Sequence, residues 1–171
     1  MAPSVKIRMA VAGDEPALAA LNAPTQQAHV AAHPEVFRPA RLRDVADWFA
    51  AFLKSPTAAA WIAEDDGGTA VGYATAQYHE RPATPFAVAR RWCEIDQLAV
   101  APSHRRGGVA RALIDAVVAD ARANGVRDVE LCVWEFNEAA RAAFRRLGFA
   151  PRHERLRLTG PRPNGRRSGG G

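Results

Sequence analysis

The transition from strand to turn to helix around residue 100 constrains the fold more than any other part of the chain. The apolar run from Ile95 to Val100 leads into a turn that Pro102 opens and that is rich in arginine and glycine. A helix with a clear apolar face begins at once, near Val109. The first backbone N–H groups of a helix have no intrahelical partners, and the helix dipole favours negative charge there. The turn is therefore predicted to bind an anion, above all a phosphate group.

The sequence of this turn excludes the two common nucleotide-binding motifs. No Lys-Ser/Thr follows its glycines, as a P-loop requires, and the G-x-G-x-x-G spacing is absent. The turn carries instead Arg-x-x-Gly-x-Ala, at Arg105, Gly108 and Ala110. This pattern resembles the coenzyme A pyrophosphate loop of the GNAT (Gcn5-related) N-acetyltransferases.

A second motif supports the same resemblance. Asn137-x-x-Ala140-x-x-x-Phe144-x-x-x-Gly148-Phe149 has the spacing of the family's Asn-x-x-Ala-x-x-x-Tyr-x-x-x-Gly-Phe helix. A simple surface turn would explain the first motif alone, but not both motifs in this order with a strand between them. The resemblance extends over the chain to about Leu158.

Hydrophobic periodicity and turn residues predict the remaining elements. In chain order, they are a strand at 5–9, a helix that Asp14 caps, a broken helix or loop at 22–40, a helix at 41–53, strands at 60–64 and 70–79 joined by Asp-Asp-Gly-Gly, a loop at 80–89, a strand at 91–100, a helix from 109 that Gly125 ends, a strand at 126–134, a helix at 137–147 that Gly148 ends, and a last strand at 149–158.

This order predicts one α/β (α+β) domain over residues 1–160. Its sheet is expected to be mixed and mostly antiparallel, with six to seven strands and helices on both faces. The resemblance implies a V-shaped splay between the strands before and after the helix that begins at Val109, with the pantetheine arm of the cofactor in the gap. Residues 161–171 form a tail of Arg, Gly, Pro and Ser without apolar residues and are predicted to be disordered.

Composition narrows the class of protein. The net charge of +5 and the pI of about 10.0 raise the question of nucleic-acid binding, but the arginines are spread along the chain, without a basic run interleaved with aromatic residues. No apolar run approaches the roughly 20 residues of a membrane helix, and the N-terminus has no signal-like apolar region. We expect a cytoplasmic protein that binds neither nucleic acid nor membrane. Cys93 and Cys132 are expected to be small buried hydrophobes, and no ligand spacing indicates a metal site.

The resemblance implies acetyl-CoA as cosubstrate and assigns the residues that bind it. Backbone N–H groups of the turn would hold the pyrophosphate, where glycines let the backbone approach closely. The end of the preceding strand would pair with the pantetheine amides. The implied cofactor-binding residues are Leu98, Ala99, Val100, Arg105, Arg106, Gly107, Gly108, Val109, Ala110, Arg111, Asn137 and Phe144. Asn137 is equally compatible with a plain helix cap.

Two acidic residues on the cofactor strand are the candidates for catalysis. Glu94 resembles the strand glutamate that is the general base in some members of the family. Asp96 should share its face unless a bulge intervenes, and would be a second carboxylate. Solvated strand residues are the alternative interpretation for both. By the same resemblance, the backbone N–H near Val100 would stabilise the oxyanion.

Phe144 departs from the family pattern. Many relatives have tyrosine there, and its hydroxyl protonates the departing thiolate, whereas phenylalanine has no proton to give. A thiolate can still leave and take a proton from water. The chain would then be slow, use another acid, or lack activity. Tyr73 and Tyr78 are the only other phenols.

The segment between the first two predicted helices corresponds to the family's acceptor region. It contains His29, His33, Glu35 and Phe37. The resemblance therefore implies an N-acetyltransferase that moves an acetyl group to a primary amine of a small molecule or peptide, by direct attack in a ternary complex. A non-catalytic acyl-CoA-binding or regulatory module and a nucleic-acid-binding domain are the rival hypotheses. Dimers are common in the family, so a homodimer is one option.

Overall fold

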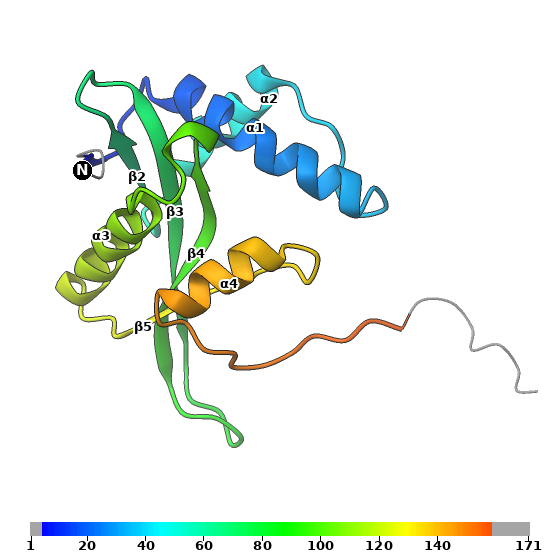
Figure 1. The fold of residues 1–171 in the computed structure, drawn as a ribbon. Helices are drawn as coiled ribbons and strands as arrows, with labels where there is room; N and C mark the ends of the chain where they lie inside the picture. The colour runs from blue at the N-terminus through cyan, green and yellow to red at the C-terminus, as the bar shows by residue number, and fades with distance from the viewer. Residues whose placement is uncertain (1–4, 159–171) are drawn as a thin grey trace, which may run out of the picture.

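The computed structural model describes residues 5–158 and shows a central sheet covered by helices on both faces (Figure 1). Helices α1 and α2 pack on one face, and α3 and α4 cover the other. The elements are β1 (Lys6–Met9), α1 (Glu15–Ala32), α2 (Leu42–Phe52), β2 (Ala58–Glu64), β3 (Ala70–Arg81), β4 (Arg90–Val100), the 3-10 turn η1 (Pro102–His104), α3 (Val109–Ala123), β5 (Asp128–Leu131) and α4 (Glu138–Arg146).

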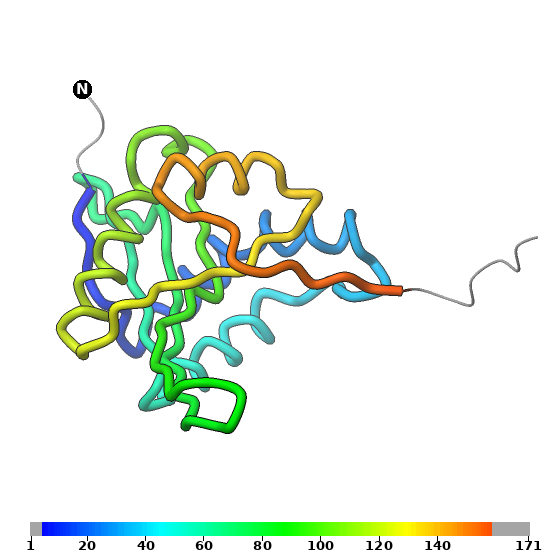
Figure 2. Tube along the Cα trace, turned by 90° about the horizontal axis from the view of Figure 1, so that it is seen from below, coloured from blue at the N-terminus to red at the C-terminus, as the bar shows by residue number. Residues whose placement is uncertain are grey.

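The sheet has the strand order β1-β2-β3-β4-β5, antiparallel from β1 to β4 and parallel between β4 and β5. This confirms the mixed, mostly antiparallel architecture. β5 pairs with β4 only from Trp92↔Asp128 to Ile95↔Leu131. Beyond Ile95, β4 continues to Val100 without β5 beside it, so the expected splay between these two strands is present (Figures 1 and 2).

A bulge in β4 lies at the mouth of this splay. Thr75 of β3 pairs with Gln97 and Ala76 pairs with Ile95, so Asp96 has no partner on β3. An unpaired residue bends a strand and increases its local twist. The bulge therefore coincides with the point where β4 turns away from β5.

The turn residues act as their sequence suggests, whereas the predicted cap Asp14 does not. The β2–β3 hairpin is closed by Asp65, whose Oδ1 accepts hydrogen bonds from the N–H groups of Gly67 and Thr69 at 3.0 and 2.8 Å. Gly125 and Gly148 end α3 and α4 with φ angles of 70° and 98°, which L side chains rarely adopt. Asp14 precedes α1 as expected, but its carboxylate binds Arg8 and the Val11 N–H instead of a helix N–H.

The prediction of a broken helix or loop at 22–40 was wrong for its first half. α1 runs without interruption through Pro24 to Ala32, and the loop occupies only the remainder. Pro24 is exposed, so its ring points away from the core and the helix loses one hydrogen bond without losing its packing. Contacts of α1 with β3, β4 and α2 outweigh that loss.

The C-terminal part of the sheet is smaller than predicted. The strand expected at 126–134 is only β5, and residues 149–158 contain no strand although they alternate in polarity. Leu156 and Leu158 are 83% and 76% exposed, so no packing stabilises a strand there. The described chain has five strands instead of six to seven. Cys132, expected to be buried, is exposed because β5 ends just before it, whereas Cys93 is buried.

The sheet separates two apolar clusters. The larger one lies under α3 and includes Ala76, Cys93, Ile95, Leu113 and Val117. The smaller one lies under α1 and α2 and consists of Leu18, Phe49, Ile62, Tyr73 and Ala99. Within the described part of the chain, no helix is long and apolar enough to cross a membrane. The disordered tail predicted for 161–171 lies outside the described residues.

Candidate cofactor and catalytic site

The loop between β4 and α3 presents a series of backbone donors. Arg106 and Gly108 have positive φ angles of 63° and 86°, which turn the chain sharply into the helix. Among residues 5–158, nothing accepts a hydrogen bond from the backbone N–H groups of 106–111. Consecutive unpaired N–H groups at a helix start form a concavity suited to an anion.

The same loop is braced against the end of β4. The Arg105 Nε donates to the Val100 carbonyl at 3.1 Å, and the Ala101 N–H donates to the Val71 carbonyl at 2.8 Å. Side chains of Leu98 and Val100 pack toward α3, and Ala99 packs toward α1 and α2. The backbone of 98–100 is thus held rigidly at the splay, where its outer edge has no β5 neighbour.

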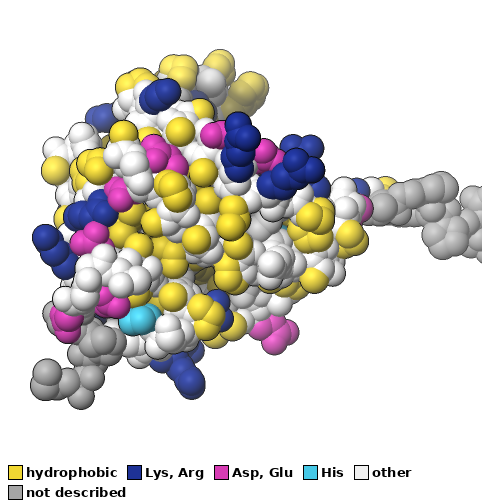
Figure 3. All heavy atoms as spheres, turned by 90° about the horizontal axis from the view of Figure 1, so that it is seen from above, with side chains coloured by type: hydrophobic (Ala, Val, Ile, Leu, Met, Phe, Trp, Pro, Cys, Tyr) yellow, Lys and Arg dark blue, Asp and Glu magenta, His cyan; other side chains and the backbone are white. Residues whose placement is uncertain are grey.

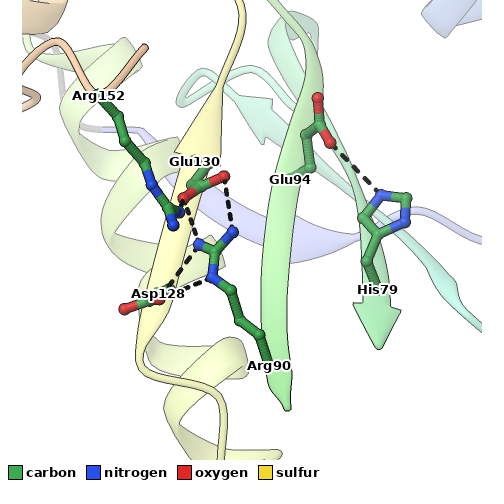
Figure 4. Close-up of polar contacts among 6 residues, drawn as sticks. All are labelled: His79, Arg90, Glu94, Asp128, Glu130 and Arg152. Carbon is green, nitrogen blue, oxygen red and sulfur yellow. Dashed lines mark hydrogen bonds and ion pairs between the residues drawn. The ribbon is translucent and has the colours of Figure 1, made fainter. Parts of the chain in front are cut away.

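Glu94 and Asp96 lie at the base of the splay, and the charge of Glu94 acts on the Asp96 carboxyl. The Glu94 side chain is 31% exposed, and its Oε2 lies 3.6 Å from His79 Nε2 (Figure 4). His79 is stacked on Trp92 with ring centroids 5.0 Å apart, which fixes the imidazole beside the carboxylate. Loss of hydration raises the pKa of Asp96, the negative charge of Glu94 adds to this rise, and His79 offsets part of it.

Other acidic groups on this side of the sheet are already neutralised. Arg90 binds Asp128 and Glu130, and Arg152 also binds Glu130 (Figure 4). By contrast, neither Glu94 nor Asp96 forms an ion pair with a lysine or arginine in the described chain. The two carboxylates therefore keep their capacity to accept a proton or hold a cation.

Cys132 places a thiol beside the Glu94 carboxylate. Its Sγ lies 3.7 Å from Glu94 Oε1. Partial burial raises the pKa of the Cys132 thiol, and the neighbouring Glu94 raises it further. The sequence pattern gave no sign of this proximity, because it depends on β5 ending at Leu131.

The two phenols considered as substitute acids are engaged elsewhere. The Tyr73 hydroxyl donates to Gln97 Oε1 at 2.8 Å and accepts from Asn22 Nδ2 at 2.9 Å, beneath α1. Burial raises the pKa of Tyr73 to about 12. The Tyr78 hydroxyl donates to Asp120 of α3. Both hydroxyls already have hydrogen-bond acceptors within the fold.

The α4 motif residues adopt the expected local structure. Asn137 caps α4, since its Oδ1 accepts from the Ala140 N–H at 3.1 Å. Phe144 packs against the larger apolar cluster and meets Phe149 edge-on, with ring centroids 5.9 Å apart.

The predicted acceptor region is built from two segments far apart in sequence. His29, His33 and Phe37 pack against Trp134 and Phe136 of the β5–α4 connection, with ring centroids between 4.8 and 6.5 Å apart. Trp134 and Phe136 were not anticipated at this place. A separate cavity of about 280 Å³ lies between α1 and α2 and is lined mostly by apolar side chains, together with Asn22 and Gln26. No group of three or more metal-binding side chains occurs among residues 5–158.

Comparison with known proteins agrees with the resemblance. The model of the Acetyltransferase (GNAT) family matches residues 23–149. The mycothiol acetyltransferase of Salinispora arenicola is 37% identical over 144 residues, which are 80% of this chain and 41% of that protein. The chain thus spans less than half the length of the curated relatives it matches.

Solved structures share the fold over most of their length. A tetramutant of the BH1408 protein from Bacillus halodurans has a TM-score of 0.85 and 25% identity, covering 90% of this chain and 99% of that one. The aminoglycoside N-acetyltransferase AAC(6')-Iy, solved in complex with CoA, has a TM-score of 0.71 and 21% identity, covering 96% and 97%.

Proposed function

Because the chain belongs to the GNAT acetyltransferase family, we propose that it transfers an acetyl group from acetyl-CoA to a primary amine. The acceptor would be a small molecule or a peptide, and the amine would attack directly in a ternary complex. The observation that carries this proposal is the arrangement of three features along the β4–β5 splay. The donor-rich loop follows the end of β4 at Val100, the outer edge of β4 beyond Ile95 has no β5 neighbour, and two carboxylates without arginine partners lie at its base.

The residues present fit coenzyme A. The unpaired N–H groups of 106–111 would bind the pyrophosphate, supported by the side chains of Arg105, Arg106 and Arg111. Leu98, Ala99 and Val100 would pair with the pantetheine amides as an added strand does. Asn137 and Phe144 would contact the pantetheine arm from α4. A CoA complex of AAC(6')-Iy and an acetyl-CoA complex from Clostridium acetobutylicum are among the structures with this fold.

The carboxylates would serve the acceptor. An ammonium group must lose a proton before its nitrogen can attack the thioester carbonyl. Glu94 would accept this proton directly or through water, and Asp96 would attract the cation. The new C–N bond would form first and give a tetrahedral oxyanion, which the Val100 N–H would stabilise. The C–S bond would break as this intermediate collapses. The CoA thiolate leaves and takes a proton from water, because Phe144 donates none.

The alternative is a module of the same fold that binds acyl-CoA without transferring the acyl group. Phe144 is the observation that favours it. Nucleic-acid binding has less support, since lysine and arginine side chains are scattered among acidic and apolar ones on the face seen in Figure 3.

Release of thiol from acetyl-CoA in the presence of kanamycin, spermidine, tyramine and a peptide with a free N-terminus tests the proposal. We expect turnover with at least one amine, and Glu94→Gln should lower its kcat/KM by about 100-fold or more. Glu80→Gln is the matched control, because the Glu80 side chain is 76% exposed and lies beside Arg91 instead of Glu94. CoA binding without turnover of any amine would instead support the non-catalytic module.

A further inference from the structure

His33 joins two segments that flank the proposed acceptor site. Its Nδ1 lies 3.1 Å from Oε1 of Glu35, in the loop after α1, and its Nε2 lies 2.9 Å from Oε1 of Glu135, between β5 and α4. The imidazole also packs on Trp134, with ring centroids 4.8 Å apart. One side chain thus holds together residues that are 102 positions apart in the sequence.

This arrangement requires the charged form of histidine. Carboxylates accept hydrogen bonds, and a neutral imidazole has only one N–H to donate. Two carboxylate partners are satisfied together only by the imidazolium, which donates from both nitrogens. The hydrogen bonds to Glu35 and Glu135 accordingly raise the pKa of His33.

The other groups facing the contact preserve this charge state. Their own backbone N–H groups, and also His33, lower the pKa of the Glu35 and Glu135 carboxyls, so both remain ionised at neutral pH. Arg157 lies 3.9 Å from Glu35, and Arg141 of α4 donates to the Glu135 carbonyl. The remaining neighbours are aromatic: His29, Phe37, Trp134 and Phe136.

The contact is linked to the catalytic carboxylate by a short piece of chain. Cys132 touches Glu94, and Trp134, two residues later, packs on His33. Release of Trp134 and Glu135 from His33 would free residues 132–136, and the wall that Cys132 forms beside Glu94 would move with them.

We propose that protonated His33 is a positioning residue that clasps residues 132–136 to the end of α1 and so keeps the acceptor side of the splay closed beside Glu94. The clasp is complete at pH values below about 6.5, the ordinary pKa of histidine. It is lost as the pH rises through the raised pKa of the folded state. The effect of this clasp on catalysis rests on the proposed function, whereas the contact between His33 and residues 132–136 does not.

The charge requirement can be tested by NMR on the intact protein. Titration of the imidazole resonances, with His33→Gln to assign them, should give His33 a pKa above 6.5. Glu35→Gln and Glu135→Gln should each lower it. A His33 pKa at or below 6.5 in the wild type, unchanged in both variants, would overturn the proposal.

The positioning role can be tested through the thiol of Cys132. Alkylation by iodoacetamide reports how open residues 132–136 are, and buried Cys93 provides an internal reference. At pH 6, His33→Gln should speed Cys132 modification by about twofold to fivefold, the factor expected of exposed ion pairs. At pH 8.5, wild type and variant should react equally. Alkylation speeds up with pH in every variant because the thiolate is the nucleophile. His33→Arg, which keeps the charge at both pH values, should therefore match the wild type at pH 6 and react about twofold to fivefold more slowly than the wild type at pH 8.5.

Equal Cys132 reactivity of wild type and His33→Gln at pH 6 would refute the clasp. For the amine that the panel identifies, KM should rise as pH increases through the His33 pKa in the wild type and stay level in His33→Arg. Absence of turnover with every amine would refute the proposed function, while the NMR and alkylation results would still decide the clasp.

Discussion

At the scale of single residues, Phe144 would decide how the thiolate leaves in the proposed reaction. The residue occupies the position at which the family's helix motif carries tyrosine, and it packs against the larger apolar cluster and against Phe149. The hydroxyls of Tyr73 and Tyr78 donate hydrogen bonds to Gln97 and Asp120, respectively. No nearby tyrosine hydroxyl thus replaces the missing one in the described chain.

We expect Phe144→Tyr to raise kcat. A positioned acid contributes about 10²–10⁴-fold in sites built around it, so a single added hydroxyl should recover about threefold to tenfold. Steady-state kinetics at saturating acetyl-CoA measures the change. Phe144→Leu is the control and should give no gain. A Phe144→Tyr enzyme no faster than wild type would mean that residue 144 does not face the thiolate.

A site residue can be predicted from the sequence only where a local pattern encodes its position. The resemblance predicts Glu94 and Asp96 as the candidate carboxylates, and their roles stay a prediction. The bulge at Asp96 arises because Thr75 of β3 pairs with Gln97 while Ala76 pairs with Ile95, and no local pattern encodes this register. Cys132 was misplaced because its exposure depends on where β5 stops.

At the scale of elements, the start of α3 depends on a glycine in the neighbouring strand. A Cβ at Gly72 would lie 3.1 Å from the Ala99 carbonyl oxygen, 3.1 Å from Val109 Cγ1 and 3.3 Å from Leu113 Cδ1. The first turn of α3 therefore sits directly on β3 where no side chain intervenes.

Gly72→Ala should displace the first turn of α3. We expect the free energy of unfolding to fall by about 1–3 kcal/mol, as for other overpacked cores, and CoA affinity to weaken with it. Urea unfolding and calorimetry with CoA measure the two effects. Gly67→Ala is the control, because its Cβ would meet only Asp65 Oδ1, at 3.4 Å. Equal stability of Gly72→Ala and wild type would contradict this account.

Element boundaries were predicted well where local chemistry sets them. Gly125, Gly148 and the Asp65 turn end or join elements as their sequence indicates. The predictions at Pro24 and at 149–158 were wrong, because tertiary packing keeps α1 continuous while Leu156 and Leu158 remain exposed. Propensity alone decides neither case.

At the scale of the whole molecule, ligand binding should stabilise the native state. At a CoA concentration 100 times the Kd, binding to the folded chain adds about 2.7 kcal/mol. For a domain of this size, this corresponds to a rise in Tm of about 5–10 °C. Thermal unfolding followed by circular dichroism measures it. Pantetheine lacks the diphosphate and should give a much smaller rise, whereas equal shifts would argue against a diphosphate site at the β4–α3 loop.

The overall architecture followed from the order of elements and the two motifs, because that order leaves few ways to bury the apolar faces. The aromatic cluster around His33 did not follow from it. Its members come from α1, the loop after it and the β5–α4 connection, and only the folded chain brings them together.

The two outermost strands of the sheet, β1 and β5, are each only four residues long. An outer strand exposes unpaired peptide groups on which another molecule can add a strand, and long flat ones promote aggregation. Here the longer strands β2 and β3 lie inside the sheet, and β5 covers β4 as far as Ile95. β5 also carries Asp128 and Glu130, and Arg152 binds Glu130. The short length and the charged residues of both edge strands should therefore help the protein to resist edge-to-edge fibril growth at high concentration.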